Sequence, residues 1–171
     1  SDNEKGSYDA VSLLASQGRK TIGFIGGNLN VSSGLERYNG YKRALADAGF
    51  TYGDEYAQLT EAYSMGRGAE CARSPIKSGI DALFISDNTL TMGAVNELKN
   101  EGISIPDRIS VIGYDNFDWM DLITPPLTTV KQQSYQMGYV AAEMVMRKLS
   151  GMDSEERMTL GTELVLRASH G

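Results

Sequence analysis

Short apolar runs alternate with stretches of helical periodicity along this chain, and the alternation restricts the folds that it can adopt. The apolar runs, typical of buried strands, lie at residues 21–27, 56–59, 82–86, 108–113, 127–130 and 160–166. Helical spacing of apolar residues marks the intervals 6–17, 34–48, 64–77, 88–100 and 133–149. Strands separated by helices of about 10–15 residues form βαβ units with right-handed crossovers. The pattern therefore predicts an α/β fold: a doubly wound, mainly parallel sheet with helices on both faces.

The ends of the expected helices carry residues that favour helix initiation or termination. Glycine follows four of the helices, at positions 18, 49, 79 and 102, where it commonly ends a helix in the left-handed conformation. Ser32 or Ser33 can cap the helix 34–48, because a serine hydroxyl accepts a hydrogen bond from a free amide of the first turn. These signals support the boundaries that the periodicity indicates.

The composition limits both the size and the surroundings of the fold. With 171 residues, 41% of them hydrophobic, the chain can build one ordinary domain with a core. A net charge of −6 argues against direct binding of nucleic-acid phosphates by these residues. A single cysteine, Cys71, suits a reducing compartment, and no apolar run approaches the roughly 20 residues of a membrane helix. No secretion signal opens the chain, so we expect a cytoplasmic protein without membrane contact.

The motifs of common catalytic chemistries are missing from the sequence. The glycines near residue 26 fit neither G-x-G-x-x-G nor G-x-x-x-x-G-K-[ST], and no G-x-S-x-G occurs. One histidine, His170, and one cysteine are too few for a usual zinc site, and His170 lies one residue from the end of the chain. Acidic residues are plentiful, yet no acidic pair sits in an apolar setting that would raise one pKa. We therefore expect no enzyme activity, no cofactor and no metal.

Polar residues follow the expected strands, at the edge where ligands bind in open parallel sheets. Asp87 comes directly after the strand 82–86, and Asp115 follows the strand 108–113 after one residue. Arg37 lies in the first turn of the helix that follows the first strand. Two carboxylates and a guanidinium can hydrogen-bond vicinal hydroxyl groups in pairs, as a sugar ligand requires.

Aromatic residues near the same loops could cover the apolar face of a sugar: Tyr63, Phe117 and Trp119. Plainer interpretations stand beside these. Asp87 could equally be the N-cap of the next helix, and Arg37 could be a surface salt-bridge partner. Trp119 is more often a packed or interface residue than a ligand contact.

Several segments match the sequence patterns of one protein family. Residues 17–27 match a strand pattern G-H-x-x-I-x-x-I-x-G, residues 37–45 match R-x-x-G-y-x-x-A-L, and residues 84–94 match a-x-N-D-x-x-A-x-G. The most specific match is 106–115, Pro-Asp-Arg-Ile-Ser-Val-Ile-Gly-Tyr-Asp, followed by Pro-Pro-Leu-Thr-Thr-Val-Lys-Gln at 125–132 and Leu-Val-Leu-Arg at 164–167. Over nearly its whole length the chain resembles the LacI/GalR-type bacterial transcription regulators.

The resemblance implies a periplasmic-binding-protein-like effector domain, with residues 1–171 forming mainly its C-terminal subdomain. The segment of about 127–150 would cross toward a first subdomain. That subdomain and a helix-turn-helix DNA-binding domain would precede the abrupt start at Ser1, and both are absent from this chain. The resemblance also places a hinge-crossing strand at 125–132.

The same resemblance assigns roles to individual positions. Arg37, Asp87 and Asp115 would contact the effector, Tyr63 would be an aromatic contact, and Lys5 would lie near the rim of the cleft. Asp87 and the residue after it invert the usual Asn-Asp order, which would alter ligand hydrogen bonding there. Arginine also stands at position 19, where histidine is usual.

The function implied is ligand sensing by a transcription regulator. A small effector, which we expect to be a sugar, would bind between two subdomains and control operator binding through a homodimer. Operator DNA would be bound by the absent domain and not by this chain. A solute-binding protein of a sugar transporter shares the fold and is the alternative. An α/β enzyme is a third class, which would need a phosphate loop or a catalytic constellation.

Overall fold

The computed structural model describes residues 1–50, 53–153 and 157–171, which contain one mixed sheet. Its strands are β1 (Ile22–Gly26), β2 (Ala57–Leu59), β3 (Ala82–Ile85), β4 (Ser110–Tyr114), β5 (Thr128–Gln132) and β6 (Thr162–Val165). In space their order is β2-β1-β3-β4-β5-β6, with the first five strands parallel and β6 antiparallel to β5. The expected mainly parallel sheet is confirmed.

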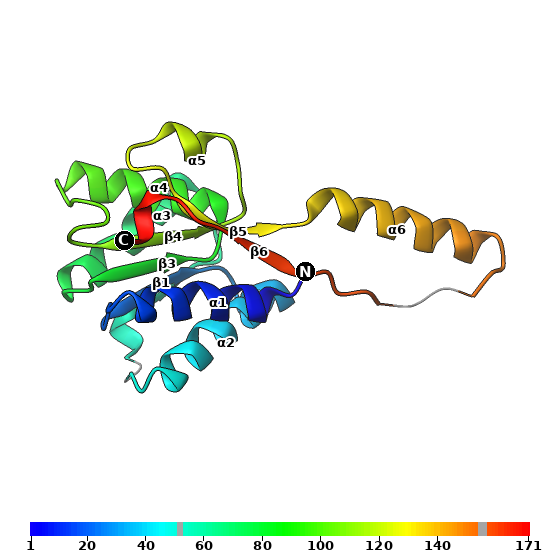
Figure 1. Ribbon diagram of the computed structural model, residues 1–171, viewed down its shortest axis with the longest axis horizontal. Helices are drawn as coiled ribbons and strands as arrows, with labels where there is room; N and C mark the ends of the chain where they lie inside the picture. The colour runs from blue at the N-terminus through cyan, green and yellow to red at the C-terminus, as the bar shows by residue number, and fades with distance from the viewer. Residues whose placement is uncertain (51–52, 154–156) are drawn as a thin grey trace.

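Helices cover both faces of this sheet (Figure 1). They are α1 (Asn3–Ser16), α2 (Ser32–Asp47), α3 (Met65–Lys77), α4 (Asn88–Asn100), α5 (Trp119–Leu122) and α6 (Ser134–Leu149), with short 3-10 helices at Asp54–Tyr56 and Ala168–His170. Phe24 of β1 packs into the core beneath α1 and α2, whereas its neighbour Ile25 packs into the core beneath α3 and α4. The expectation of a doubly wound fold with two helical layers is therefore confirmed.

Side-chain caps fix the starts of three helices. The carboxylates of Asp2 and Asp87 and the hydroxyl of Ser64 each accept a hydrogen bond from the amide three residues on, at 2.9–3.2 Å. The expected serine cap of α2 is wrong, because Val31 is the N-cap and makes no side-chain cap bond. A turn closed by the Val31 amide on the Asn28 carbonyl, at 3.2 Å, leads directly into this helix.

The segment around α6 differs from the rest of the molecule. It leaves the sheet after β5 and extends away from the body, and the chain returns along β6 (Figure 1). No residue of α6 is buried, and Tyr135, Tyr139 and Leu149 are among its exposed apolar side chains. None of the helices among the described residues has both the length and the apolar character needed to cross a membrane.

Candidate functional site

The carboxyl ends of β1, β3 and β4 meet at one edge of the sheet, because these strands are parallel and adjacent. Asp87 lies two residues after β3, and Asp115 directly follows β4. The topology therefore brings the two carboxylates to the edge that commonly binds ligands in open α/β sheets.

Asp115 is held in an uncommon backbone conformation at this edge. Its φ of 66° makes it the non-glycine residue with positive φ among the described residues. The Gln132 side-chain amide, at the end of β5, donates a hydrogen bond of 2.5 Å to Asp115 Oδ1. A positive φ costs conformational free energy in residues other than glycine, and such residues concentrate at functional sites. The conformation therefore marks Asp115 as a site candidate.

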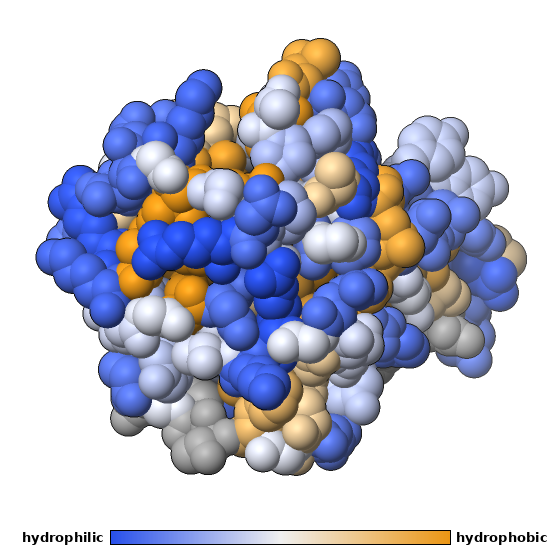
Figure 2. Space-filling view, turned by 60° about the vertical axis from the view of Figure 1, so that its left-hand side comes forward, coloured by the Kyte–Doolittle hydropathy of each residue, from blue (hydrophilic) through white to orange (hydrophobic). Residues whose placement is uncertain are grey.

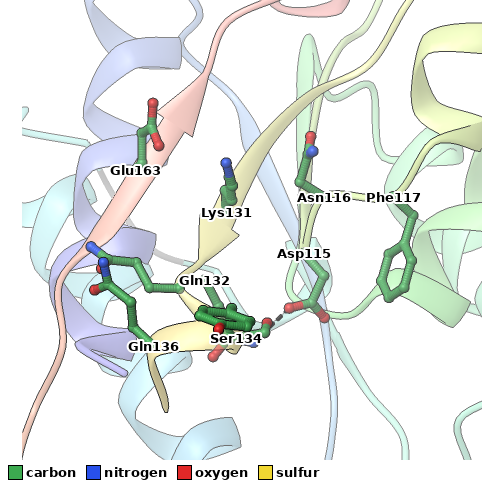
Figure 3. Close-up of a pocket in the computed structure, with 10 residues that line it drawn as sticks. Asp115, Asn116, Phe117, Lys131, Gln132, Ser134, Gln136 and Glu163 are labelled. Carbon is green, nitrogen blue, oxygen red and sulfur yellow. Dashed lines mark hydrogen bonds between the residues drawn. The ribbon is translucent and has the colours of Figure 1, made fainter. Parts of the chain in front are cut away.

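A cavity of about 670 Å³ opens beside Asp115 (Figure 3). It lies between the loop after β4, the end of β5, the start of α6 and β6, and its lining is Asp115, Asn116, Phe117, Lys131, Gln132, Gln133, Ser134, Tyr135, Gln136 and Glu163. The lining combines carboxylate acceptors, amide and ammonium donors and two aromatic rings. Such a set can hydrogen-bond a small hydroxyl-rich molecule and cover its apolar face.

Arg37 reaches the same edge from α2. Its Nη1 donates to the carbonyl of Ser86 at 2.7 Å and its Nε donates to Asn3 Oδ1 at 3.0 Å. Its guanidinium carbon lies 3.7 Å from the ring centroid of Tyr114, a cation–π contact. In the part of the chain that the structure describes, Arg37 makes no ion pair, so the surface salt-bridge interpretation is not favoured.

Two further predicted residues lie along this edge. The carboxylate of Asp87 accepts from the Leu90 amide at 2.9 Å, so the plainer interpretation as an N-cap of α4 is correct for one of its oxygens. Tyr63 is about half exposed, and its hydroxyl occupies the space where a side chain at Gly27 would lie. Gly27 therefore leaves room for Tyr63 over the end of β1.

Lys5 and Trp119 lie elsewhere. The exposed ammonium of Lys5 pairs with Asp9 on α1 at 2.5 Å, in a shallow depression that does not include Asp115. The Trp119 indole nitrogen donates to Asn88 Oδ1 at 3.1 Å, and its ring lines a separate apolar cavity of about 740 Å³ between α4 and α5. Of the predicted site residues, only Asp115 and Phe117 line the cavity; Arg37, Asp87 and Tyr63 lie along the same edge of the sheet outside it, and Lys5 and Trp119 lie elsewhere.

Tyr114, beneath Arg37, makes the folding stability of the protein depend on pH. Burial raises the pKa of its phenol from the ordinary value of 10.0 to about 12, while the nearby Arg37 guanidinium lowers it. The folded protein keeps the proton that the unfolded chain releases, so the stabilisation is complete below pH 10 and is lost between about pH 10 and 12. We expect Tyr114→Phe to reduce this alkaline loss of stability by about 2–3 kcal/mol.

Urea unfolding of both proteins across pH 8–12 measures the difference, and Tyr139→Phe, on the exposed surface of α6, is the matched control. Equal pH slopes for the parent protein and Tyr114→Phe would contradict the assignment.

Several residues of the site escaped the sequence analysis. Gln132, Lys131 and Asn116 line the cavity, and Asn3 accepts a hydrogen bond from Arg37. Pairing of β4 with β5 brings the end of β5 to Asp115, where the Gln132 amide binds it, so an assumed strand order could have identified this region. No local signal in the sequence points to Asn3.

The chain is similar in sequence and in structure to known proteins. A family described as periplasmic binding protein-like domain matches residues 11–170. The HTH-type transcriptional repressor PurR of Vibrio atlanticus is 33% identical over 171 residues, covering 98% of this chain and 51% of that protein. A LacI-family sugar-binding transcriptional regulator from Escherichia coli, solved with phosphate, has a TM-score of 0.88 at 28% identity and covers 98% of this chain and 61% of its own. The transcriptional regulator CelR in complex with cellobiose has a TM-score of 0.90 at 28% identity, over 98% and 52% of the two chains.

The match covers the whole sheet and all the predicted site residues except Lys5. The chain spans about half the length of the curated relatives it matches. Those relatives are named as transcriptional repressors, in agreement with the expectation that the chain is not an enzyme. The chain belongs to the periplasmic binding protein-like domain family, in the form found in the effector-binding domains of LacI-type transcription regulators.

Proposed function

We propose that the chain senses a small polar effector for a cytoplasmic transcription regulator, with Asp115 as the central ligand contact. The observation that carries this proposal is the cavity at the carboxyl edge of the sheet, where Gln132 fixes the carboxylate of a residue with positive φ. Arg37, Asp87, Tyr63 and Phe117 would complete the contacts along this edge. Lys5 and Trp119, which lie outside this cavity, are not ligand contacts in this proposal.

A sugar is the effector class that the lining favours. Asp115 supplies a carboxylate acceptor, and Gln132 and Ser134 supply donors beside it, so that neighbouring hydroxyl groups can be bound in pairs. Lys131 and Glu163, paired between β5 and β6, point away from this group (Figure 3). Phe117 is half exposed and offers a ring face to the apolar side of a sugar ring. Among the relatives, one regulator is described as sugar-binding and another is in complex with cellobiose.

A second subdomain would close over this edge and contact α6. This helix has no buried residue although it carries Tyr135, Tyr139 and Leu149, so an apolar partner surface would stabilise it. Residues 127–150 would then cross between the subdomains, and ligand binding would change their relative orientation. DNA binding would reside in a separate domain, as the name HTH-type of the relatives suggests.

A homodimer is the assembly that would transmit the change. Figure 2 shows apolar side chains gathered in exposed patches on the side that lies at the left of Figure 1. The apolar cavity between α4 and α5, lined by Met92, Trp119, Leu122 and Ile123 among others, offers a surface for a second copy. The alternative, a solute-binding protein of a transporter, has no support in the names of the relatives given above, which are regulators.

The proposal is tested by a thermal-shift screen of the natural protein with monosaccharides, disaccharides, sugar phosphates and nucleobases. A ligand at about a hundred times its Kd stabilises the folded state by about 2.7 kcal/mol, which corresponds to a rise in Tm of roughly 5–10 °C. We expect a sugar or sugar derivative to give such a rise. Asp115→Asn, which keeps the volume and removes the charge, should weaken its binding at least about tenfold.

Asp107→Asn is the control, because Asp107 is exposed and precedes β4 at the opposite edge of the sheet. A rise in Tm with a nucleobase alone would contradict the sugar assignment. Equal sugar affinity in the Asp115→Asn variant and the parent protein would contradict the site.

A further inference from the structure

The guanidinium of Arg167, just after β6, binds three points of the segment 116–127, which joins β4 to β5 and lies 40–51 positions earlier in the chain. Nη2 donates to Asn116 Oδ1 at 2.9 Å, and Nη1 donates to the Leu127 carbonyl at 2.8 Å. Nε and Nη2 also pair with the two carboxylate oxygens of Asp121 on α5. The side chain is only 10% exposed, so these contacts are largely shielded from water.

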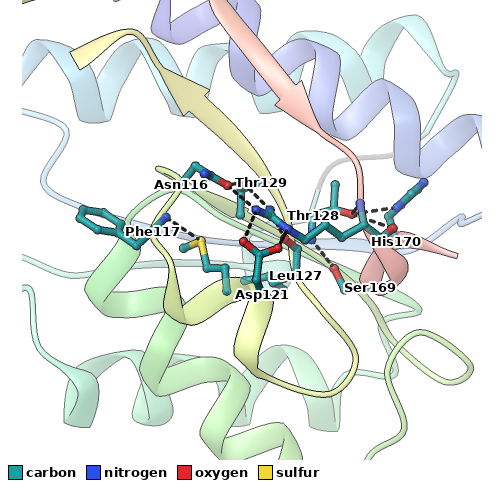
Figure 4. A network of polar contacts seen from close by, with 10 residues as sticks. Asn116, Phe117, Asp121, Leu127, Thr128, Thr129, Ser169 and His170 are labelled. Carbon is teal, nitrogen blue, oxygen red and sulfur yellow. Dashed lines mark hydrogen bonds and ion pairs between the residues drawn. The ribbon is translucent and has the colours of Figure 1, made fainter. Parts of the chain in front are cut away.

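The contact with Asn116 bears directly on the ligand edge. Asn116 follows Asp115, and its Oδ1 accepts from both Arg167 and the Thr129 hydroxyl, at 2.9 Å each (Figure 4). The backbone before Asp115 is held by the sheet, because Tyr114 is the last residue of β4 and pairs with Val130 of β5. A residue with φ of 66° keeps that conformation only when the chain is held on both sides. The backbone after Asp115 is held by the hydrogen bonds of the Asn116 side chain.

We propose that Arg167 is a positioning residue, which keeps Asp115 in its positive-φ conformation by anchoring Asn116. Without the guanidinium, Asn116 keeps one donor, Thr129, and the loop can relax toward the negative φ that non-glycine residues prefer. The Asp115 carboxylate then leaves its place beside Gln132. The consequence for effector affinity rests on the proposed function, whereas the conformational role does not.

A purely structural role for Arg167 would be to fasten the end of the chain, but other contacts already do this. The Ser169 hydroxyl donates to the Val111 carbonyl at 2.6 Å and accepts from the Thr128 amide at 2.8 Å. The Ser110 hydroxyl donates to the His170 carbonyl at 2.8 Å, and the backbone amide of Arg167 donates to Thr128 Oγ1 at 2.8 Å. None of these contacts needs the Arg167 side chain, so its removal leaves the terminal segment attached.

Hydrogen–deuterium exchange without ligand tests the proposal on the natural protein. Arg167→Met and Asn116→Ala should each speed exchange in the segment 115–118 by about tenfold. Each removes the charge-assisted hydrogen bond between Arg167 and Asn116 that restrains this segment. Arg167→Lys should resemble Arg167→Met, because a single ammonium cannot reach Asn116, Asp121 and Leu127 as the planar fork does. Asp121→Asn, which keeps the contact between Arg167 and Asn116, is the control and should stay within about twofold of the parent protein.

The pattern of exchange decides the outcome. Faster exchange confined to residues after 162, or spread evenly over the sheet, would overturn the proposal, because either pattern indicates a general structural role. Unchanged exchange at 115–118 would overturn it as well. If no sugar binds the parent protein while the loop exchanges as expected, the proposed function fails and the positioning role of Arg167 stands.

Discussion

Replacing Gly93 by alanine is expected to destabilise the protein by about 3 kcal/mol or more. Gly93 lies on α4 where this helix crosses α3, and a Cβ there would overlap the Met65 carbonyl and lie 2.9 Å from the Ala69 nitrogen. Both neighbours are backbone, so no side-chain rotation can relieve the overlap. Gly68 mirrors the arrangement from α3, where a Cβ would lie 2.9 Å from the Leu90 Cα. The helices must therefore separate, which opens the core beneath them.

Gly66→Ala is the matched control, because Gly66 lies on α3, the partner helix in this crossing, and a Cβ there meets nothing within 4 Å. We expect this variant to be as stable as the parent protein or more stable by up to about 1 kcal/mol, since alanine favours helix over glycine. Urea unfolding followed by circular dichroism measures both variants. A Gly93→Ala protein within about 0.5 kcal/mol of the parent would show that the close crossing is not required.

The layers of the fold could be predicted from the sequence because strand and helix periods differ so clearly. The periodicity predicts the helix 88–100 with its observed ends, since Asp87 caps its start and Gly102, with φ of 66°, follows its end. The periodicity predicts a start of α1 at Gly6, three residues late, because its cap, Asp2, lies before the apolar periodicity begins. The start of α2 was missed for the related reason that a backbone turn, and not a serine hydroxyl, opens it.

The site was predictable only where it depends on strand ends. Asp115 directly follows β4 and Asp87 lies two residues after β3, so the rule for parallel sheets places them at one edge without knowledge of packing. The bond between Arg167 and Asn116 spans 51 positions of the chain and depends on the place of β6 in the sheet. The proximity of Asn3 to Arg37 likewise depends on how α1 packs against α2. Contacts of this kind follow from tertiary packing, which leaves no local pattern in the sequence.

Arg37→Met is expected to destabilise the protein by about 3 kcal/mol, through the loss of the guanidinium's hydrogen bonds and of its cation–π contact. The substitution leaves the Ser86 carbonyl without the guanidinium donor and Asn3 Oδ1 with only the Tyr114 hydroxyl at 3.3 Å, and Ser86 and Asn3 are both buried. It also removes the cation from the face of Tyr114, which is itself fully buried. Because Arg37 joins α2 to the ends of β3 and β4, the same substitution should weaken effector binding at least about tenfold.

Arg43→Met is the control, because it also removes an arginine from α2 but leaves the contacts of Arg37 intact. Arg43 also pairs with a residue of α1, Glu4, and also lies over a tyrosine, Tyr8, at 4.4 Å from the ring centroid. Its side chain is 49% exposed, however, and solvent-exposed ion pairs contribute roughly 0–1 kcal/mol. Urea unfolding should therefore show a loss for Arg37→Met at least about twice that for Arg43→Met. Equal losses would mean that Arg37 acts as an ordinary surface residue, and its place at the ligand edge would then have no energetic basis.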